Sequence, residues 1–499
     1  MGTVLKSSLL NLAATLVSLL AGFAVSILNA RLLGPEGSGL AAFALWFATS
    51  ASALADRGMP QTMLRSLGTH EDDPAAPWKA TVRAAFSLFI RPVFAAALAT
   101  AAYSLWATFE NGPERGLFWA AALLLFLCYA FFAFTTAAAR GRGNFRETAV
   151  NTVSGSLLQL PFIVAGAHFL GAAGAVAGMA VRFVPQLFNL HRYVDLSLRP
   201  EPARLTPEMR RYARQMWLSD LIDVVIMTRV ELALLGLFFS STDMGYFAAA
   251  AVFAGLVGQF ALQLSPALIV GFSTIEEAGD TRARLFANAM RFTALGIFPI
   301  AFGGAAIIQQ LLPLAFGEAF APAGSAAAVL LIASAITGIA VIPWAFLAAT
   351  GGSGSLLHIM TGSAIVTVAL LTGGIFLAGL KGAAIARMLA ECLTLAMLIL
   401  AIRKRTRFTI PYVTLFKAML AAAACGFAAH LAVRTLDGWA GITVGIVAGA
   451  LTYPLALRGF RLVLDADTAA LFDSRAAQRL PHRVRSILAA TLHLVSVRA

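Results

Sequence analysis

Long apolar segments are the feature that most limits what this chain can fold into. Fourteen runs of about 20 or more predominantly apolar residues follow one another, and about 20 such residues carry a helix across a bilayer. The runs lack the alternation of a transmembrane β-strand, and a helix satisfies its backbone polar groups within one segment. We therefore predict an all-α polytopic membrane protein with about 14 transmembrane helices. The runs lie at 9–33, 38–56, 84–107, 116–139, 147–169, 171–190, 215–239, 244–271, 288–315, 322–349, 356–379, 381–402, 412–433 and 439–459.

Composition supports this prediction. Of the 499 residues, 59% are hydrophobic and only 12% are charged, whereas soluble domains carry about 25% charged residues. So few charges do not cover the surface of a soluble protein of this length, which argues against soluble enzymes, secreted scaffolds and nucleic-acid-binding domains. The net charge of +13 is instead explained by where the basic residues fall along the chain.

The distribution of Lys and Arg predicts the orientation in the membrane. Of the 37 basic residues, 29 fall in the two termini or in the loops predicted on the same side of the membrane as the termini. Only Arg31, Arg115, Lys381 and Arg434 fall in the loops of the other side. By the positive-inside rule, both termini are cytoplasmic and no nucleic-acid partner is needed. The outer loops are short, as at 240–243 and 317–321. Since they leave no room for an extracytoplasmic catalytic domain, we expect no enzyme activity and no catalytic residues.

An internal repeat divides the chain. Gly39 matches Gly245 and Pro60 matches Pro266 at an offset of 206, and two further matches follow at offsets of 211 and 209. An even number of spans per repeat gives two lobes of equal orientation, an arrangement that moves substrate between lobes by rocking. We predict two pseudo-symmetric six-helix lobes plus two C-terminal helices. The predicted parts are an N-lobe at 1–200, an interlobe linker at 201–214, a C-lobe at 215–402, two helices within 403–461 and a basic cytoplasmic tail at 462–499 that forms an amphipathic helix or is disordered.

Several motifs resemble one family of transporters. The segment 29–40 reads NARLLGPEGSGL and is followed by Asp56-Arg57-Gly58, which resembles the opening of Wzx-type polysaccharide flippases. Thr228-Arg229-Val230-Glu231, the later Gly245-Tyr246 pair and the turn at 316–322 are similar to motifs of the same proteins. The likeness covers residues 5–400. Wzx-type flippases belong to the multidrug/oligosaccharidyl-lipid/polysaccharide exporter (MOP) superfamily.

The resemblance implies a function and a set of partners. It implies a flippase that moves an undecaprenyl-diphosphate-linked oligosaccharide from the cytoplasmic to the periplasmic leaflet of a bacterial inner membrane, for surface polysaccharide biosynthesis. The implied partners are the lipid-linked oligosaccharide, the bilayer and other membrane proteins of polysaccharide assembly. No nucleotide-binding loop or metal cluster is apparent, so we expect no cofactor or metal, and transport driven by Na⁺, H⁺ or substrate flux.

Three alternatives stay open at this point. A lipid II flippase of the same superfamily is expected to carry arginines in its first helix, whereas no charge lies between Lys6 and Arg31. A drug/cation antiporter is expected to have an acidic cavity with few arginines. The third alternative is a membrane component of a polysaccharide-synthesis complex that transports nothing itself.

Ionisable residues within predicted spans are candidates for function, since an unpaired charge is costly in the membrane. The candidates for binding the diphosphate or sugar are Arg229, Arg182, Arg31 and Arg91, and those for ion coupling are Asp220, Asp223 and Glu231. On one straight α-helix the three carboxylates share a stripe and Arg229 lies opposite. The alternative is a structural ion-pair network, or a helix-end anchor for Arg31 and snorkelling for Arg91. For Arg387 and Glu391, four residues apart, we expect a structural pair.

Overall fold

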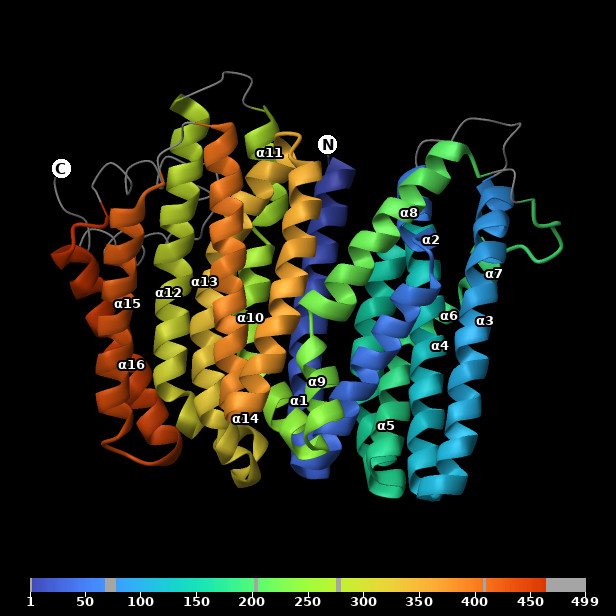
Figure 1. The fold of residues 1–499 in the computed structure, drawn as a ribbon, viewed down its shortest axis with the longest axis horizontal. Coiled ribbons are helices and arrows are strands. Elements are labelled where there is room, and N and C mark those ends of the chain that lie inside the picture. Colours follow the sequence, from blue (N-terminus) through green and yellow to red (C-terminus); the bar gives the residue numbers. More distant parts are fainter. Residues whose placement is uncertain (1, 68–77, 202–204, 275–279, 407–409, 464–499) are drawn as a thin grey trace. The chain divides into compact units, whose positions relative to one another are not determined.

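The computed structural model describes residues 2–67, 78–201, 205–274, 280–406 and 410–463. Most of the predicted basic tail, from residue 464 onward, lies outside these residues. The described residues are almost wholly helical and contain no strand, so the predicted all-α class is confirmed (Figure 1). They form two compact units, 1–248 and 249–499.

Unit 1 begins with the longest helix and ends within α10. Its helices are α1 (Gly2–Ala55), α2 (Met59–Ser66), α3 (Trp78–Asn111), α4 (Pro113–Gly141), α5 (Phe145–Ala180), η1 (Val181–Phe183), α6 (Val184–Leu187), α7 (Leu190–Tyr193), α8 (Pro207–Leu221), η3 (Ile222–Met227), α9 (Val230–Phe238) and the start of α10 (Ser241–Leu262). Within this unit α3, α4 and α5 run side by side (Figure 1).

Unit 2 contains the rest of α10 and the helices that follow it. They are α11 (Ser265–Thr274), α12 (Asp280–Phe316), η4 (Glu318–Ala323), α13 (Gly324–Ala349), α14 (Ser353–Arg405), α15 (Tyr412–Val433) and α16 (Gly438–Gly459). The last two form an antiparallel pair that packs on α12, where Ile307, Ala429 and Ile442 are buried together.

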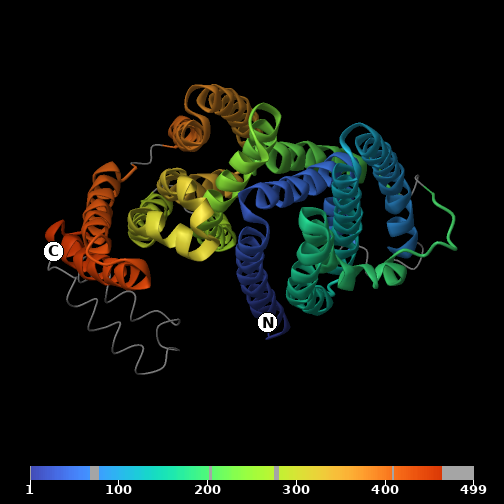
Figure 2. The same ribbon diagram turned by 90° about the horizontal axis from the view of Figure 1, so that it is seen from below.

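Ten helices in the described part of the chain are long and apolar enough to cross a membrane. Three of them are interrupted by a glycine with positive φ, which is Gly34 in α1, Gly171 in α5 and Gly379 in α14. In α1 the interruption bends the helix, as Figure 2 shows for its deep-blue segment. The chain is a multi-pass membrane protein, while the number of 14 crossings stays a prediction.

The interruptions in α5 and α14 have the same backbone geometry. Leu170 and Gly171 have φ/ψ of −132°/15° and 56°/−136°, and Ala378 and Gly379, 208 residues later, have −146°/23° and 54°/−131°. Both helices fold back on themselves, because Gly166 meets the backbone of Gly174 and an equivalent pair occurs in α14. Equal conformations at this offset agree with the predicted repeat. Glycine is required because φ is positive there.

Each unit has an aromatic core. In unit 1, Phe89 of α3 lies with its ring centroid 4.8 Å from that of Phe134 of α4, and both side chains are fully buried. In unit 2, the rings of Phe272 and Phe286 lie 5.4 Å and 5.6 Å from that of Phe346. These rings pack the spans of each unit together.

The two glycines that mark the repeat meet in unit 1. A side-chain carbon on Gly39 would collide with the carbonyl oxygen of Ser241, and one on Gly245 would collide with that of Pro35. Small residues at such crossings let helix backbones approach closely in a bilayer. The start of the second repeat therefore packs within unit 1, and the compact units divide at 248 and not at the sequence linker. The predicted lobe boundaries rest on the repeat alone and stay a prediction.

The predicted seventh span is not one straight helix. The chain forms α8, then the π-helix η3, and then leaves helical geometry at Arg229, where φ/ψ is −158°/39°, before α9 begins. A π-helix and a break change the angle between successive side chains. The prediction that Asp220, Asp223 and Glu231 share one stripe opposite Arg229 is therefore wrong in its geometry.

Candidate functional site

A large cavity opens at the end of unit 1 that holds the turn between α3 and α4. Its volume is about 1290 Å³, which exceeds the roughly 300–1,000 Å³ of ordinary small-molecule sites. Its walls come from α1 after the bend at Gly34, the adjoining ends of α3 and α4, the turn around Gly171, α9 and the start of α10. We call it the aromatic cavity, because seven of its 25 lining residues are aromatic against 10% in the whole chain.

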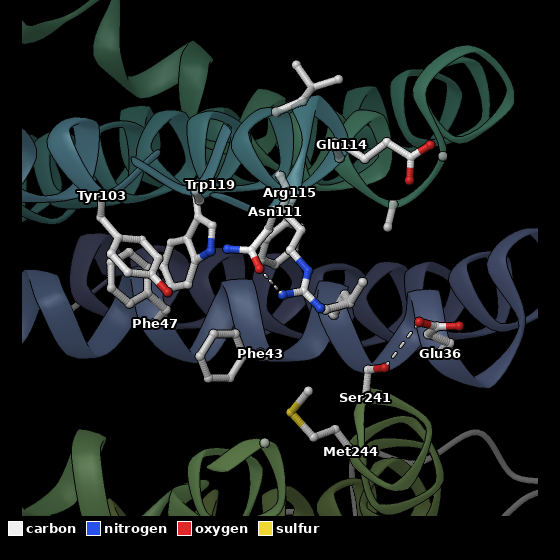
Figure 3. Close-up of a pocket in the computed structure, with 18 of the residues that line it drawn as sticks. Glu36, Phe43, Phe47, Tyr103, Asn111, Glu114, Arg115, Trp119, Ser241 and Met244 are labelled. Carbon is white, nitrogen blue, oxygen red and sulfur yellow. Dashed lines mark hydrogen bonds between the residues drawn. The ribbon is translucent and has the colours of Figure 1, made fainter. Parts of the chain in front are cut away.

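Trp119 is the centre of the aromatic wall (Figure 3). Its ring centroid lies 4.8 Å from that of Tyr103 and 5.2 Å from that of Phe47, and both pairs are nearly perpendicular. Phe43 lies 6.1 Å away at 87°. Since these contacts are edge-on, they leave ring faces without a parallel stacking partner among the rings of this wall.

Polar side chains line the cavity near the helix ends (Figure 3). Arg115 donates from Nη1 to Oδ1 of Asn111 at 2.9 Å, and Ser241 donates to Oε1 of Glu36 at 3.4 Å. Glu114 also lines the cavity. Asn111, Glu114, Arg115 and Glu36 are not buried, so this arrangement offers hydrogen-bond donors and acceptors beside aromatic faces.

A second polar cluster lies where α8 meets the end of α1. We call Asp56, Gly58, Gln61, Trp217 and Asp220 the polar corner. Trp217 donates from its indole nitrogen to the carbonyls of Ala53 and Leu54, at 3.0 Å and 3.2 Å. Asp220 accepts a hydrogen bond from the side chain of Gln61.

Asp56 follows the last residue of the α1 span and is only 9% exposed. It accepts a hydrogen bond from the backbone of Gly58 at 2.7 Å. Burial raises its pKa to about 7, and the negative charge of Asp220 adds to the rise while the Gly58 bond opposes it. The polar corner thus brings the carboxyl of Asp56, just after α1, near that of Asp220 in α8, and the proximity of Asp220 opposes the ionisation of Asp56.

The structure divides the predicted residues of the seventh span into two pairs. Asp220 lies in the polar corner, within electrostatic reach of Asp223, which is exposed one turn later. Arg229 is at the break before α9, where it interacts electrostatically with the buried Glu231. Arg229 and Glu231 therefore act on each other, although a straight helix would have placed them on opposite sides.

The remaining predicted arginines lie elsewhere in unit 1. Arg182 is half-buried in η1, with its guanidinium 5.9 Å from the ring centroid of Phe183 and within electrostatic reach of Tyr129. Arg31 and Arg91 are exposed, in α1 just before its bend and in α3 before Pro92. None of the seven predicted site residues lines the aromatic cavity. Their roles in substrate binding or ion coupling stay predictions.

In unit 2 the expected pair within α14 is present. Arg387 donates from Nε to Oε1 of Glu391, four residues on, at 3.0 Å. Its Nη2 atom also lies 3.0 Å from that oxygen. Glu391 is 8% exposed, so the two charges neutralise each other inside the unit. The predicted structural pair is confirmed. Among the described residues, no group of three or more His, Cys, Asp or Glu side chains is arranged to hold a metal ion.

A family model described as polysaccharide biosynthesis protein matches residues 28–325, which is more than half of the chain. The chain belongs to this family. The matched segment includes every residue that lines the aromatic cavity. The search of curated proteins found no match.

Solved structures of the MOP superfamily have the same fold as this family member. A lipid II flippase MurJ in an inward closed conformation matches with a TM-score of 0.70 and 14% identity, over 91% of this chain and 98% of that one. An inward-facing multidrug resistance MATE transporter of the MOP superfamily matches with a TM-score of 0.59 and 16% identity, over 80% and 97%. An outward-facing MATE transporter of the same superfamily matches with a TM-score of 0.52 and 16% identity, over 80% and 94%. The resemblance seen in the sequence is thus confirmed for family and fold.

Sequence reasoning missed Phe43, Phe47, Tyr103 and Trp119, although a signal for some of them is present. Tyr103 and Trp119 each stand eight residues from Asn111, and a tight turn joins the two antiparallel helices there. Residues equally far from such a turn face each other. Phe43 and Phe47 are four residues apart on one helix and so share a face. Neither pair indicates a cavity by itself. The cavity wall becomes visible only when Phe43 and Phe47 of α1 are seen beside Tyr103 of α3 and Trp119 of α4.

Proposed function

We propose that this protein is an alternating-access flippase for an undecaprenyl-diphosphate-linked oligosaccharide, which it moves from the cytoplasmic to the periplasmic leaflet. One observation carries the proposal: a polysaccharide biosynthesis family coincides, in one chain, with the fold of MOP transporters. A multi-pass protein of such a pathway, with charged side chains inside its helical units, is suited to carry a polar intermediate across the bilayer. It forms no covalent bond in this role.

The proposal assigns a side of the membrane to each end of unit 1. By the positive-inside rule, the aromatic cavity faces the periplasm and the polar corner faces the cytoplasm of a bacterial inner membrane, with both termini cytoplasmic. Arg229, Arg182, Arg31 and Arg91 attract the diphosphate along the path, and Asp220, Asp223 and Glu231 couple transport to Na⁺ or H⁺. Other membrane proteins of polysaccharide assembly are the expected partners.

The test depletes the protein in its host and follows lipid-linked intermediates. We expect the completed undecaprenyl-diphosphate-linked oligosaccharide to accumulate on the cytoplasmic side while surface glycan is lost. Wild type is expected to restore surface glycan, and Arg229→Ala is expected not to, at equal protein level and thermal stability. Arg403→Ala, an exposed position at the end of α14, is the control and is expected to restore it.

The same experiment separates the alternatives. Accumulation of lipid II with intact surface glycan would assign the protein to peptidoglycan synthesis, which the fold match to a lipid II flippase makes worth measuring. Loss of drug resistance with both lipid pools unchanged would instead point to an antiporter. Intact surface glycan and unchanged lipid pools after depletion would reject the proposal.

A further inference from the structure

We propose that the aromatic cavity is a binding site for uncharged sugar residues, and that it excludes the diphosphate. The inference rests on the proposed function, because it assigns one chemical part of the lipid-linked substrate to one site. It goes beyond that function, because a flippase needs a path but does not require a separate glycan site.

The walls of the cavity match the faces of sugar rings. A pyranose presents C–H groups on its faces, and the negative face of an aromatic ring attracts their partly positive hydrogens. Trp119 makes nearly perpendicular contacts with Tyr103, Phe43 and Phe47. Such a contact covers the face of only one ring of each pair, so the wall keeps ring faces that are not stacked in parallel. The indole N–H of Trp119 is a hydrogen-bond donor in this wall and can donate to a sugar hydroxyl.

The polar groups match sugar hydroxyls. Glu36 and Glu114 present carboxylate oxygens, which accept strong hydrogen bonds from hydroxyl donors. Asn111 offers donors from its amide nitrogen while its oxygen is engaged by Arg115. Aromatic faces thus lie beside several hydrogen-bond acceptors at one end of the cavity. This combination suits an oligosaccharide, because each of its rings has apolar C–H faces and polar hydroxyl groups.

Charge decides which part of the substrate the cavity accepts. Its charged lining residues are Glu36, Glu114 and Arg115, so the lining carries two negative charges and one positive. The one cation already donates to Asn111 at 2.9 Å. A diphosphate placed here would face two carboxylates at close range, and such juxtaposition of like charges opposes binding. Neutral or amino sugars meet no such opposition, whereas uronic acids do.

Volume supports more than one ring. At about 1290 Å³ the cavity is larger than sites that hold a single drug-sized ligand. A prenyl chain is the competing occupant, since aliphatic residues also line the walls. The aromatic enrichment and the four charged or amide side chains at one end favour the glycan, because a prenyl chain would leave those groups unused.

The experiment measures binding and not transport. Purified full-length protein in lipid nanodiscs is titrated with a neutral β-linked gluco-oligosaccharide and with an oligogalacturonate of the same length, by calorimetry and saturation-transfer NMR. We expect the neutral probe to bind about tenfold more tightly than the acidic one, which corresponds to about 1.4 kcal/mol. Equal affinity for both probes, or no binding of the neutral probe, would overturn the proposal.

Two variants test the site itself. Trp119→Ala is expected to weaken binding of the neutral probe by about tenfold or more, while Trp439→Ala, at an exposed position in α16, leaves it unchanged. The double variant Glu36→Gln and Glu114→Gln preserves shape and is expected to bind the oligogalacturonate more tightly than wild type does. This second variant keeps the test valid if Trp119→Ala folds poorly. Wild-type affinities in both variants would place the glycan elsewhere.

A competition arm separates the two occupants. Displacement of the neutral probe by a short prenyl alcohol, with a stronger effect of Trp119→Ala on the alcohol, would assign the cavity to the lipid tail and overturn the inference. The proposed function is rejected by a different result. If the cavity binds glycan but depletion causes no accumulation of lipid-linked oligosaccharide, flipping is rejected while the glycan site stands. Conversely, accumulation on depletion with no glycan binding in the cavity rejects the site and leaves flipping.

Discussion

The two ends of unit 1 join the same helices in different ways. At the aromatic cavity, α10 meets α1 through Gly39 and Gly245, whose backbones touch without intervening side chains. At the polar corner, α8 meets α1 through the hydrogen bonds of Trp217, and the carboxyls of Asp56 and Asp220 lie within electrostatic reach of each other. One end is held by backbone fit, and the other by polar groups of which two can change their charge.

This difference bears on how the unit can move. A contact of backbone against backbone has no side chain that can change rotamer or protonation, so it acts as a fixed point. At the polar corner, ionisation of both carboxyls places two negative charges near each other, so the stability of this contact depends on pH. We therefore expect the glycine contact to be insensitive to pH and the polar corner to respond to it. The predictions below test this contrast.

The largest effect is expected from adding one carbon at the glycine contact. Gly39→Ala places a methyl group against the carbonyl of Ser241 and the backbone of Gly245. Overpacking of this kind costs about 1–3 kcal/mol, and we expect a lower thermal midpoint of the purified protein. Gly22→Ala in the same helix is the control, because nothing lies within 4 Å of its added carbon. Equal midpoints for the two variants would show that the contact is not tight.

The next effect is a pH dependence at the polar corner. The pKa of Asp56 is raised from 3.8 to about 7, so its contribution to stability is complete below 3.8 and is lost as the pH rises through about 7. Asp220 and Tyr129 face it from α8 and α4. We expect the thermal midpoint to fall over this interval in wild type and to fall less in Asp56→Asn. The same slope in both proteins would assign the pH dependence to other groups.

A smaller effect is expected from one hydrogen-bonding group of the polar corner. Trp217→Phe keeps an aromatic ring but removes the N–H that donates to Ala53 and Leu54. A net hydrogen bond contributes about 1 kcal/mol, so we expect faster amide hydrogen exchange in α8 with little change in α3. Trp439→Phe, in α16, is the matched control. Unchanged exchange in α8 would mean that these bonds do not hold the helix.

The smallest effect is expected beside the glycine contact. Ser241→Ala removes a long, exposed hydrogen bond of 3.4 Å to Glu36, and exposed substitutions of this kind stay within about 0.5 kcal/mol. The thermal midpoint is therefore expected to match that of wild type. A clear loss of stability would show that side chains, and not only the backbone fit, hold this end of the unit together.

Some of the site could be predicted from the sequence and some could not. The Arg387–Glu391 pair was predictable because both residues lie on one continuous helix, where four residues make a turn. The stripe of Asp220, Asp223 and Glu231 was not, because the same count assumed a regular helix that η3 and the break at Arg229 interrupt. Local counting succeeds only where the helix is regular.

The sequence by itself determined the helical class, the multi-pass character and the family. These follow from apolar runs whose backbone groups must bond within their own segment, and from motifs that are local in the chain. The tertiary structure alone decided that Trp119 joins Phe43 in one wall and that Asp56 lies within electrostatic reach of Asp220. Those contacts join helices distant in sequence, and the packing of neighbouring side chains selects them, which no local pattern encodes.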